Sequence, residues 1–195
     1  MAADRRIPSG EGARGERRRR EPRPLDPAQL EALALAYVAR FATSAAKLER
    51  YLVRKLRERG WEGEADAQPD AAALVERFVA LGYVDDAAYA RARSGGLLRR
   101  GYGPRRIGQD LGAAGIAEDL REEVRPGEAP RRAAALALAR KRRFGPFGTE
   151  RPDPARREKQ IAAMLRAGHM LADVRAVIDA AGQEAAEEWA AASED

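Results

Sequence analysis

The stretch GYVDDAAYARARSGGLLRRGYGPRRIGQDLGAAGI, residues 82–116, decides the fold of this chain. Three of its glycines close an amphipathic stretch and are followed at once by a bulky apolar or aromatic residue, and a fourth such pair lies upstream: Gly60-Trp61, Gly82-Tyr83, Gly101-Tyr102 and Gly115-Ile116. Glycine adopts the left-handed backbone conformation that ends many helices, and the apolar residue after it can fold back onto the last turn. Each pair therefore predicts a helix end, and the series predicts a row of short helices.

Residues that favour helix N-termini stand before, between and after these ends: Asp26-Pro27, Thr43 or Ser44, Asp70, Asp85 or Asp86, Gly103-Pro104 and Asp153-Pro154. The helices fall into groups of three, because the middle helix of each group can be superposed on the others. Leu56, Leu111 and Met164 each lie four residues before a glycine, namely Gly60, Gly115 and Gly168. We interpret this pattern as three tandem repeats.

The predicted fold class is all-α, with tandem repeats of three-helix units that form an elongated array whose curvature the sequence leaves open. The units span residues 26–83, 84–126 and 127–182. Residues 1–25 read as a disordered basic tail, since they have almost nothing apolar to bury, and residues 183–195 as a frayed acidic tail.

Composition excludes several kinds of site. There is no cysteine, so disulfides and thiolate chemistry are absent, and the single His169 cannot form a histidine metal site alone. No phosphate loop, metal-ligand cluster or nucleophile motif is present, which predicts a protein that is not an enzyme and needs no cofactor. No apolar stretch approaches the roughly 20 residues that span a bilayer, so we expect a soluble, cytoplasmic protein.

Charge is distributed unevenly along the chain. Residues 62–90 hold seven acidic residues and one basic residue, Arg77, whereas residues 129–168 hold eleven basic and three acidic residues. The two ends of such an array can meet surfaces of different charge.

Basic residues beside helix ends are the candidates for contact with DNA or a protein partner. Arg140, Lys141, Arg142 and Arg143 precede Phe144 and Phe147, a combination that could bind phosphate and stack on bases. The alternative is a helix C-terminus that favours cations, with both phenylalanines in the core. The remaining candidates are Arg99, Arg100, Arg105 and Arg106 around one helix end and the next helix start, with Arg156 and Arg157 in the basic segment.

Three other features have simpler interpretations. Asp85 and Asp86 resemble a catalytic carboxylate pair, but their place after Gly82-Tyr83 favours helix caps. His169 occupies the apolar position after Gly168, which favours a packed imidazole. Glu184, Glu187 and Glu188 read as part of the acidic tail, with masking of the basic third repeat as the alternative.

The chain resembles the RecX family, the regulators of the RecA recombinase. The resemblance rests on Gly82-Tyr83-Val84-Asp85-Asp86 with Tyr89-Ala90, and on Gly101-Tyr102-Gly103 with Arg105-Arg106-Ile107, Leu111 and Gly115-Ile116. It covers about residues 28–180. The resemblance implies tandem three-helix repeats that lie in the groove of the RecA filament on DNA and restrain ATP hydrolysis, strand exchange and coprotease activity. It implies no catalytic residues.

Glycines inside the predicted helices of the second repeat depart from this pattern. Gly95 and Gly96 fall in one helix and Gly108 and Gly112 in the next, and each costs about 1 kcal/mol relative to alanine. Ala114 also stands where the family often has a lysine. The glycines either loosen the repeat or permit close packing, and the sequence does not decide between these.

Two function hypotheses follow. The first is a non-enzymatic regulator, acting as a monomer, that binds the RecA filament and contacts single- or double-stranded DNA weakly or indirectly. The alternative is a sequence-independent DNA-binding adaptor that acts without RecA, for which the basic third repeat is the basis.

Overall fold

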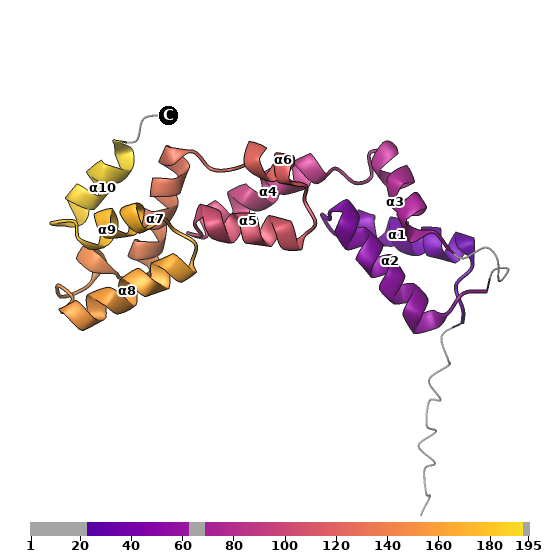
Figure 1. Ribbon diagram of the computed structural model, residues 1–195, viewed down its shortest axis with the longest axis horizontal. Helices are drawn as coiled ribbons and strands as arrows, with labels where there is room; N and C mark the ends of the chain where they lie inside the picture. The colour runs from indigo at the N-terminus through magenta and orange to yellow at the C-terminus, as the bar shows by residue number, and fades with distance from the viewer. Residues whose placement is uncertain (1–22, 63–68, 193–195) are drawn as a thin grey trace, which may run out of the picture.

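The computed structural model describes residues 23–62 and 69–192. They form a row of helices along one long axis (Figure 1). The first unit contains α1 (Pro27–Arg40), α2 (Ala45–Arg59) and α3 (Ala71–Ala80), and the second contains α4 (Asp86–Arg99), α5 (Pro104–Ala113) and α6 (Glu118–Glu123). The third contains α7 (Glu128–Arg142), a short 3-10 turn (Gly145–Phe147), α8 (Pro154–Arg166) and α9 (Leu171–Ile178), followed by α10 (Gln183–Ala191). The predicted all-α, elongated fold is confirmed.

Each unit is built around its own apolar cluster. The first cluster includes Leu48, Leu52 and Phe78, all fully buried. The second is centred on Ile107 and Leu111, and the third on Met164 and Val177. Because each cluster draws on helices that are close in sequence, the core is divided along the row, as expected for repeated units that contact only their neighbours.

The predicted helix ends share one hydrogen-bond geometry. Gly82, Gly101, Gly115 and Gly168 all have positive φ, between 74° and 93°. The residue after each glycine donates its backbone N–H to a carbonyl five residues back, as in Tyr102 to Leu97 at 3.1 Å. Gly60 also has positive φ, but here Leu25 donates to the Gly60 carbonyl at 2.9 Å and forms a short bridge with Trp61.

Helix α7 ends in the same way without a glycine. Arg143 adopts the left-handed conformation, with φ 55° and ψ 48°, and Phe144 N–H bonds to the Ala139 carbonyl at 2.9 Å. An arginine in this conformation is uncommon because its Cβ crowds the backbone. For this reason the glycine pattern could not reveal the end of α7.

The predicted capping residues are confirmed at five helix starts: Asp26, Ser44, Asp70, Asp85 and Asp153 each accept a backbone N–H with the side chain. Asp86 has a different role, because its Oδ1 accepts the Ala45 N–H at the start of α2 from 2.8 Å. The two aspartates are thus hydrogen-bond acceptors for two helix N-termini.

The middle helices α2, α5 and α8 follow one another end to end along the row (Figure 1). At the first junction, the Ser44 hydroxyl at the start of α2 donates to the Ala114 carbonyl at the end of α5, at 2.6 Å. At the second, Gly103 N–H at the start of α5 donates to the Ala167 carbonyl at the end of α8, at 2.9 Å. Both junctions therefore join the capping residue of one middle helix to the residue before the glycine stop of the next.

At the second junction the backbones themselves are in contact. A Cβ on Gly103 would lie within 3.0 Å of the Gly168 backbone, and a Cβ on Gly168 within 3.0 Å of the Arg106 nitrogen. Arg105 N–H also bonds to the Gly168 carbonyl at 3.2 Å. This contact, which we call the glycine seam, fixes the second unit against the third.

Two expectations about the chain ends have different outcomes. The acidic stretch after residue 182 is not a frayed tail over its described part, because Gln183–Ala191 form α10, which packs on α7 with Ala186 fully buried. Trp189 supplies an apolar anchor, which explains why this acidic segment folds. The predicted disordered tail lies almost entirely outside the described residues.

Candidate nucleic-acid and filament interface

Four basic side chains gather in a groove between the second and third units. Arg100 comes from the end of α4, Lys141 and Arg142 from the end of α7, and Arg166 from the end of α8. The groove has a volume of about 320 Å³, and none of the described residues that line it carries a carboxylate. We call it the basic groove. Tyr102 and Phe144 form part of its wall.

The basic groove forms because three helix C-termini converge on it. The last carbonyls of a helix carry partial negative charge, so cations in the last turn are favourable there. Arg99, Arg142 and Arg166 are the last residues of α4, α7 and α8. Stabilisation by the helix dipole and contact with a partner are thus compatible explanations for these cations. The helix C-terminus stabilises the positive charge, and the groove exposes it to solvent.

Of the predicted site residues, the structure brings together Arg100, Lys141 and Arg142 in the basic groove. Arg99 and Arg143 are exposed close by in sequence, and Arg106 borders the glycine seam. None of the ion pairs between described residues involves Lys141, Arg142, Arg143 or Arg166. These cations remain available to an external anion.

Two predicted candidates are instead held by acidic side chains. Arg157 makes a bidentate contact with Asp179, with both N–O distances at 2.6 Å, and also pairs with Glu158. The pKa of Asp179 is lowered by the hydrogen bonds from Arg157. Arg140 pairs with Glu187 of α10 and lies 5.6 Å from the Phe147 ring centroid.

The two remaining candidates lie elsewhere on the surface. Arg156 is exposed at the start of α8, and Arg105 lines a different groove.

Both phenylalanines of the basic run pack partly buried against the third cluster. Phe144 also lines the basic groove, whereas Phe147 lies under Arg140. The core interpretation of these rings therefore holds, and only Phe144 has a place on the candidate surface.

The residues predicted from the sequence do not include Arg166 or three exposed arginines of α2. Arg166 stands two residues before Gly168, as Arg99 stands two residues before Gly101, so its position relative to a glycine stop could have revealed it. Arg50, Arg54 and Arg57 form an exposed line on α2, and Arg50 donates to the Ala113 carbonyl at the end of α5, at 3.0 Å. Their spacing of four and three residues marks one helix face.

His169 lies in the glycine seam and is fully buried, as predicted for a packed imidazole. Its Nε2 donates to the Gly101 carbonyl at 2.9 Å, and its Nδ1 has no hydrogen-bond partner among the described residues. Burial lowers the pKa of this side chain from its ordinary value of 6.5, opposed by the bond to Gly101 and by nearby Asp173. The imidazole is therefore neutral in the folded protein near pH 7.

This pKa predicts how stability depends on pH. Between the lowered folded pKa and the ordinary value of 6.5, the unfolded chain binds the proton and the folded chain does not. The free energy of unfolding should therefore fall as pH drops below 6.5, by at most about 1.4 kcal/mol per pH unit from this group. His169→Gln keeps a side-chain N–H donor but does not titrate. Denaturant unfolding at several pH values should show a shallower decline for the variant, and equal declines would contradict this role for His169.

Metal sites and membrane-spanning helices are not found in the part of the chain that the structure describes. No group of three or more His, Asp or Glu side chains is placed to hold a metal ion among residues 23–62 and 69–192. None of the described helices is both long and apolar enough to cross a membrane.

Comparison with known proteins identifies the family. A family model described as the second three-helix domain of RecX matches residues 85–124. The chain is 35% identical over 182 residues to the regulatory protein RecX of Myxococcus xanthus, and the alignment covers 87% of this chain and 95% of that protein. The chain belongs to the RecX family of regulatory proteins. It is also 42% identical over 110 residues to a regulatory protein RecX of Thermus thermophilus, covering 56% of this chain and 71% of that one.

Solved structures of RecX proteins share the fold. The crystal structure of RecX from Lactobacillus salivarius aligns with a TM-score of 0.59 at 17% identity, over 78% of this chain and 94% of that one. A second RecX crystal structure aligns with a TM-score of 0.57 at 21% identity, over 78% and 72% of the two chains. The resemblance inferred from the sequence motifs is therefore confirmed for both family and fold.

Proposed function

We propose that this RecX protein binds the RecA filament on DNA, lies in the filament groove, and lowers RecA's ATP hydrolysis, strand exchange and coprotease activity. Membership of the RecX family across nearly the whole length of a relative carries the proposal. The row of helices supports it, because an elongated body presents one long face to a filament (Figure 1). The protein would act without catalysis of its own, as a monomer and in the cytoplasm, where the RecA filament assembles.

The basic groove is the proposed contact with DNA phosphates in this assembly. Its unpaired cations suit a polyanion, and charge-assisted contacts to phosphate are strong. Contact through a few cations alone gives weak, salt-sensitive affinity for bare DNA. The filament would add protein contacts, so binding to RecA-coated DNA should be tighter than binding to DNA alone.

DNA-dependent ATP hydrolysis by RecA tests the proposal directly. Adding the purified protein at ratios up to one per RecA monomer should slow hydrolysis severalfold at low salt, because a ligand seated across adjacent RecA subunits restrains their turnover. Electron microscopy of the same samples should show filaments that carry the protein or are shortened by it. Unchanged hydrolysis together with unchanged filament length would reject the proposed function.

The alternative, a DNA-binding adaptor that acts without RecA, is supported by the basic groove and by the cations on α2. Under this alternative, affinity for bare DNA would equal or exceed affinity for RecA-coated DNA. Titration of both under the same salt conditions separates the two functions.

A further inference from the structure

Helix α5 carries two glycines whose cost the fold does not explain. Gly108 and Gly112 are one turn apart on α5 and each weakens a helix by about 1 kcal/mol relative to alanine. Among the described residues, a Cβ on Gly108 would meet nothing within 4 Å, and a Cβ on Gly112 would meet only the end of the Arg121 side chain, at 3.6 Å. Close packing within this chain is therefore not the reason for either glycine. Because Gly108 has no side chain, it leaves a bare stretch of α5, where no side chain covers the backbone.

That bare stretch lies in a groove of about 340 Å³ between α5, α6 and the turn after α8. Apolar side chains form much of its lining: Ile107 and Leu111 from α5, Pro104, Pro126 and Met170. Met170 is 45% exposed and Leu171, next to it, is 43% exposed. We call this the Met170 groove. An apolar floor that ends in exposed methionine is typical of a surface that a protein partner covers.

The rim of the Met170 groove is cationic. Arg105, Arg121 and Arg125 line it. Among the described residues of the lining, Glu122 alone has a carboxylate, and it is already paired with Arg125 at 3.1 Å. Nε of Arg121 is buried and has no hydrogen-bond partner among the described residues. A buried donor without an acceptor costs free energy that an incoming acceptor would recover. The rim therefore favours a negatively charged occupant.

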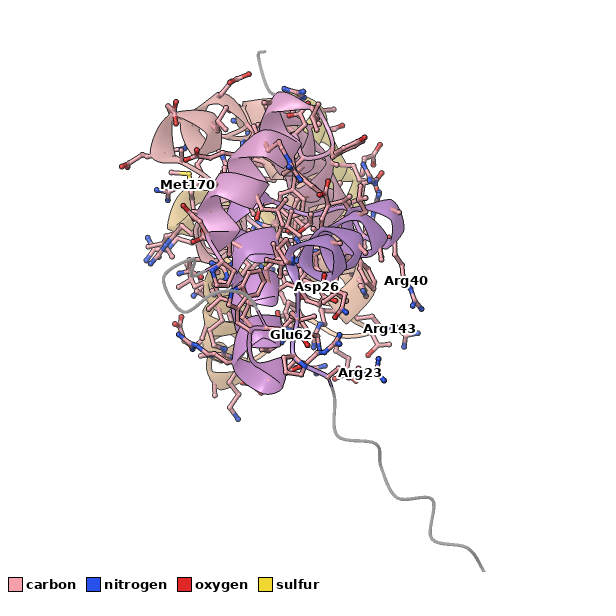
Figure 2. All side chains as sticks on the ribbon, turned by 90° about the vertical axis from the view of Figure 1, so that its right-hand side faces the viewer. Arg23, Asp26, Arg40, Glu62, Arg143 and Met170 are labelled. Atoms are coloured by element: carbon pink, nitrogen blue, oxygen red, sulfur yellow. The ribbon has the colours of Figure 1, made fainter. Side chains whose placement is uncertain are left out.

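The groove faces away from the edge of the molecule that carries Arg143. Looking along the row, Figure 2 shows Met170 and Arg143 at opposite edges. A ligand in the Met170 groove can therefore be bound independently of a strand at that other edge.

We propose that the Met170 groove binds an acidic protein segment that inserts one apolar side chain against Met170 and the bare surface at Gly108. The apolar floor favours a polypeptide over a nucleic-acid backbone, which offers phosphates but no aliphatic side chain. This inference rests on the proposed function, because RecA in the filament is the protein partner that would supply the segment. Arg105 and Arg121 would pair with its carboxylates.

Filling the groove tests the proposal with a variant that should not unfold. Gly108→Leu places a side chain in the groove at a position with open space, and replacing a helical glycine with leucine raises helix propensity. Gln109→Leu is the matched control, because it adds the same side chain to an exposed position of α5 outside the groove lining. Thermal unfolding should show that Gly108→Leu is at least as stable as wild type.

Binding is measured by cosedimentation with RecA filaments on a single-stranded oligonucleotide, and separately by anisotropy with the same oligonucleotide bare. We expect Gly108→Leu to weaken filament binding about tenfold and to leave bare DNA binding unchanged, with Gln109→Leu altering neither. If wild type binds filaments and Gly108→Leu binds equally well, the groove proposal is overturned alone. If Gly108→Leu weakens both kinds of binding equally, the groove contacts nucleic acid and the proposal is also wrong. Absence of filament binding by wild type would reject the proposed function and this inference together.

Discussion

Replacing Gly168 with alanine is expected to lower the free energy of unfolding by about 4 kcal/mol, because backbone strain and a steric clash add at one residue. The φ of Gly168 is 93°, a value that alanine adopts only with strain. Its new Cβ would also lie within 3.0 Å of the Arg106 backbone across the glycine seam. Relief of that clash requires the second and third units to separate, which breaks the hydrogen bonds from Gly103 and Arg105 to the α8 turn. Denaturant unfolding followed by circular dichroism measures the loss.

Two matched variants separate the strain from the clash. Gly82→Ala has the strain alone, because φ is 74° and a Cβ would meet nothing within 4 Å, so it should cost about 1 to 2 kcal/mol. Gly103→Ala has the clash alone, because its φ is −84° and its Cβ would lie within 3.0 Å of the Gly168 backbone. We expect about 2 to 3 kcal/mol for this second control. Equal losses for Gly82→Ala and Gly168→Ala would show that the units do not rely on the seam.

Removing two charges from the basic groove, by Lys141→Gln with Arg166→Gln, is expected to weaken binding to single-stranded DNA about tenfold at low salt. The two side chains come from different helices and neither is paired with a carboxylate among the described residues, so both are free to contact phosphate. Each lost phosphate contact should reduce the slope of log affinity against log salt by about 0.7, for a total near 1.4. Fluorescence anisotropy between low and physiological salt measures affinity and slope together.

The control for this pair must remove the same charge elsewhere. Arg77→Gln with Arg175→Gln does so, because Arg77 pairs with Glu31 in the first unit and Arg175 is exposed on α9 outside the groove. If both double variants lose affinity equally, net charge and not the basic groove determines binding. If neither loses affinity, the groove does not contact DNA. Both double variants should unfold at the same denaturant concentration as wild type to within experimental error, because exposed charges contribute little to stability.

Much of the fold could be predicted from short segments. The ends of α3, α4, α5 and α8 follow from a glycine and the residue after it, and five helix starts follow from a capping side chain that bonds three residues ahead. The end of α7 lies outside this glycine pattern, because Arg143 takes the left-handed conformation that glycine usually takes. Helix α10 was not predicted, because its acidic composition indicates a frayed tail. In the structure, Ala186 and Trp189 pack on the third unit.

The candidate site was predicted less completely. Positive charge beside a helix end indicates Arg100, Lys141 and Arg142, and the structure places them together with Arg166, which the prediction does not include. Arg140 and Arg157 had the same appearance in the sequence but are paired with Glu187 and Asp179. Their partners lie 47 and 22 residues away, a separation at which sequence spacing carries no information on contact.

The sequence by itself determined five helix starts and the ends of α3, α4, α5 and α8, because caps and glycine stops depend on backbone conformation and on bonds within about five residues. Only the tertiary structure decided which helix ends meet. The basic groove exists because the glycine seam brings α4 and α8 together with α7, and the Met170 groove because the same seam places the turn after α8 beside α5. These approaches depend on contacts between residues more than 60 apart in the sequence, such as the hydrogen bond from His169 Nε2 to the Gly101 carbonyl, 68 residues away. The physical reason is packing, not local preference.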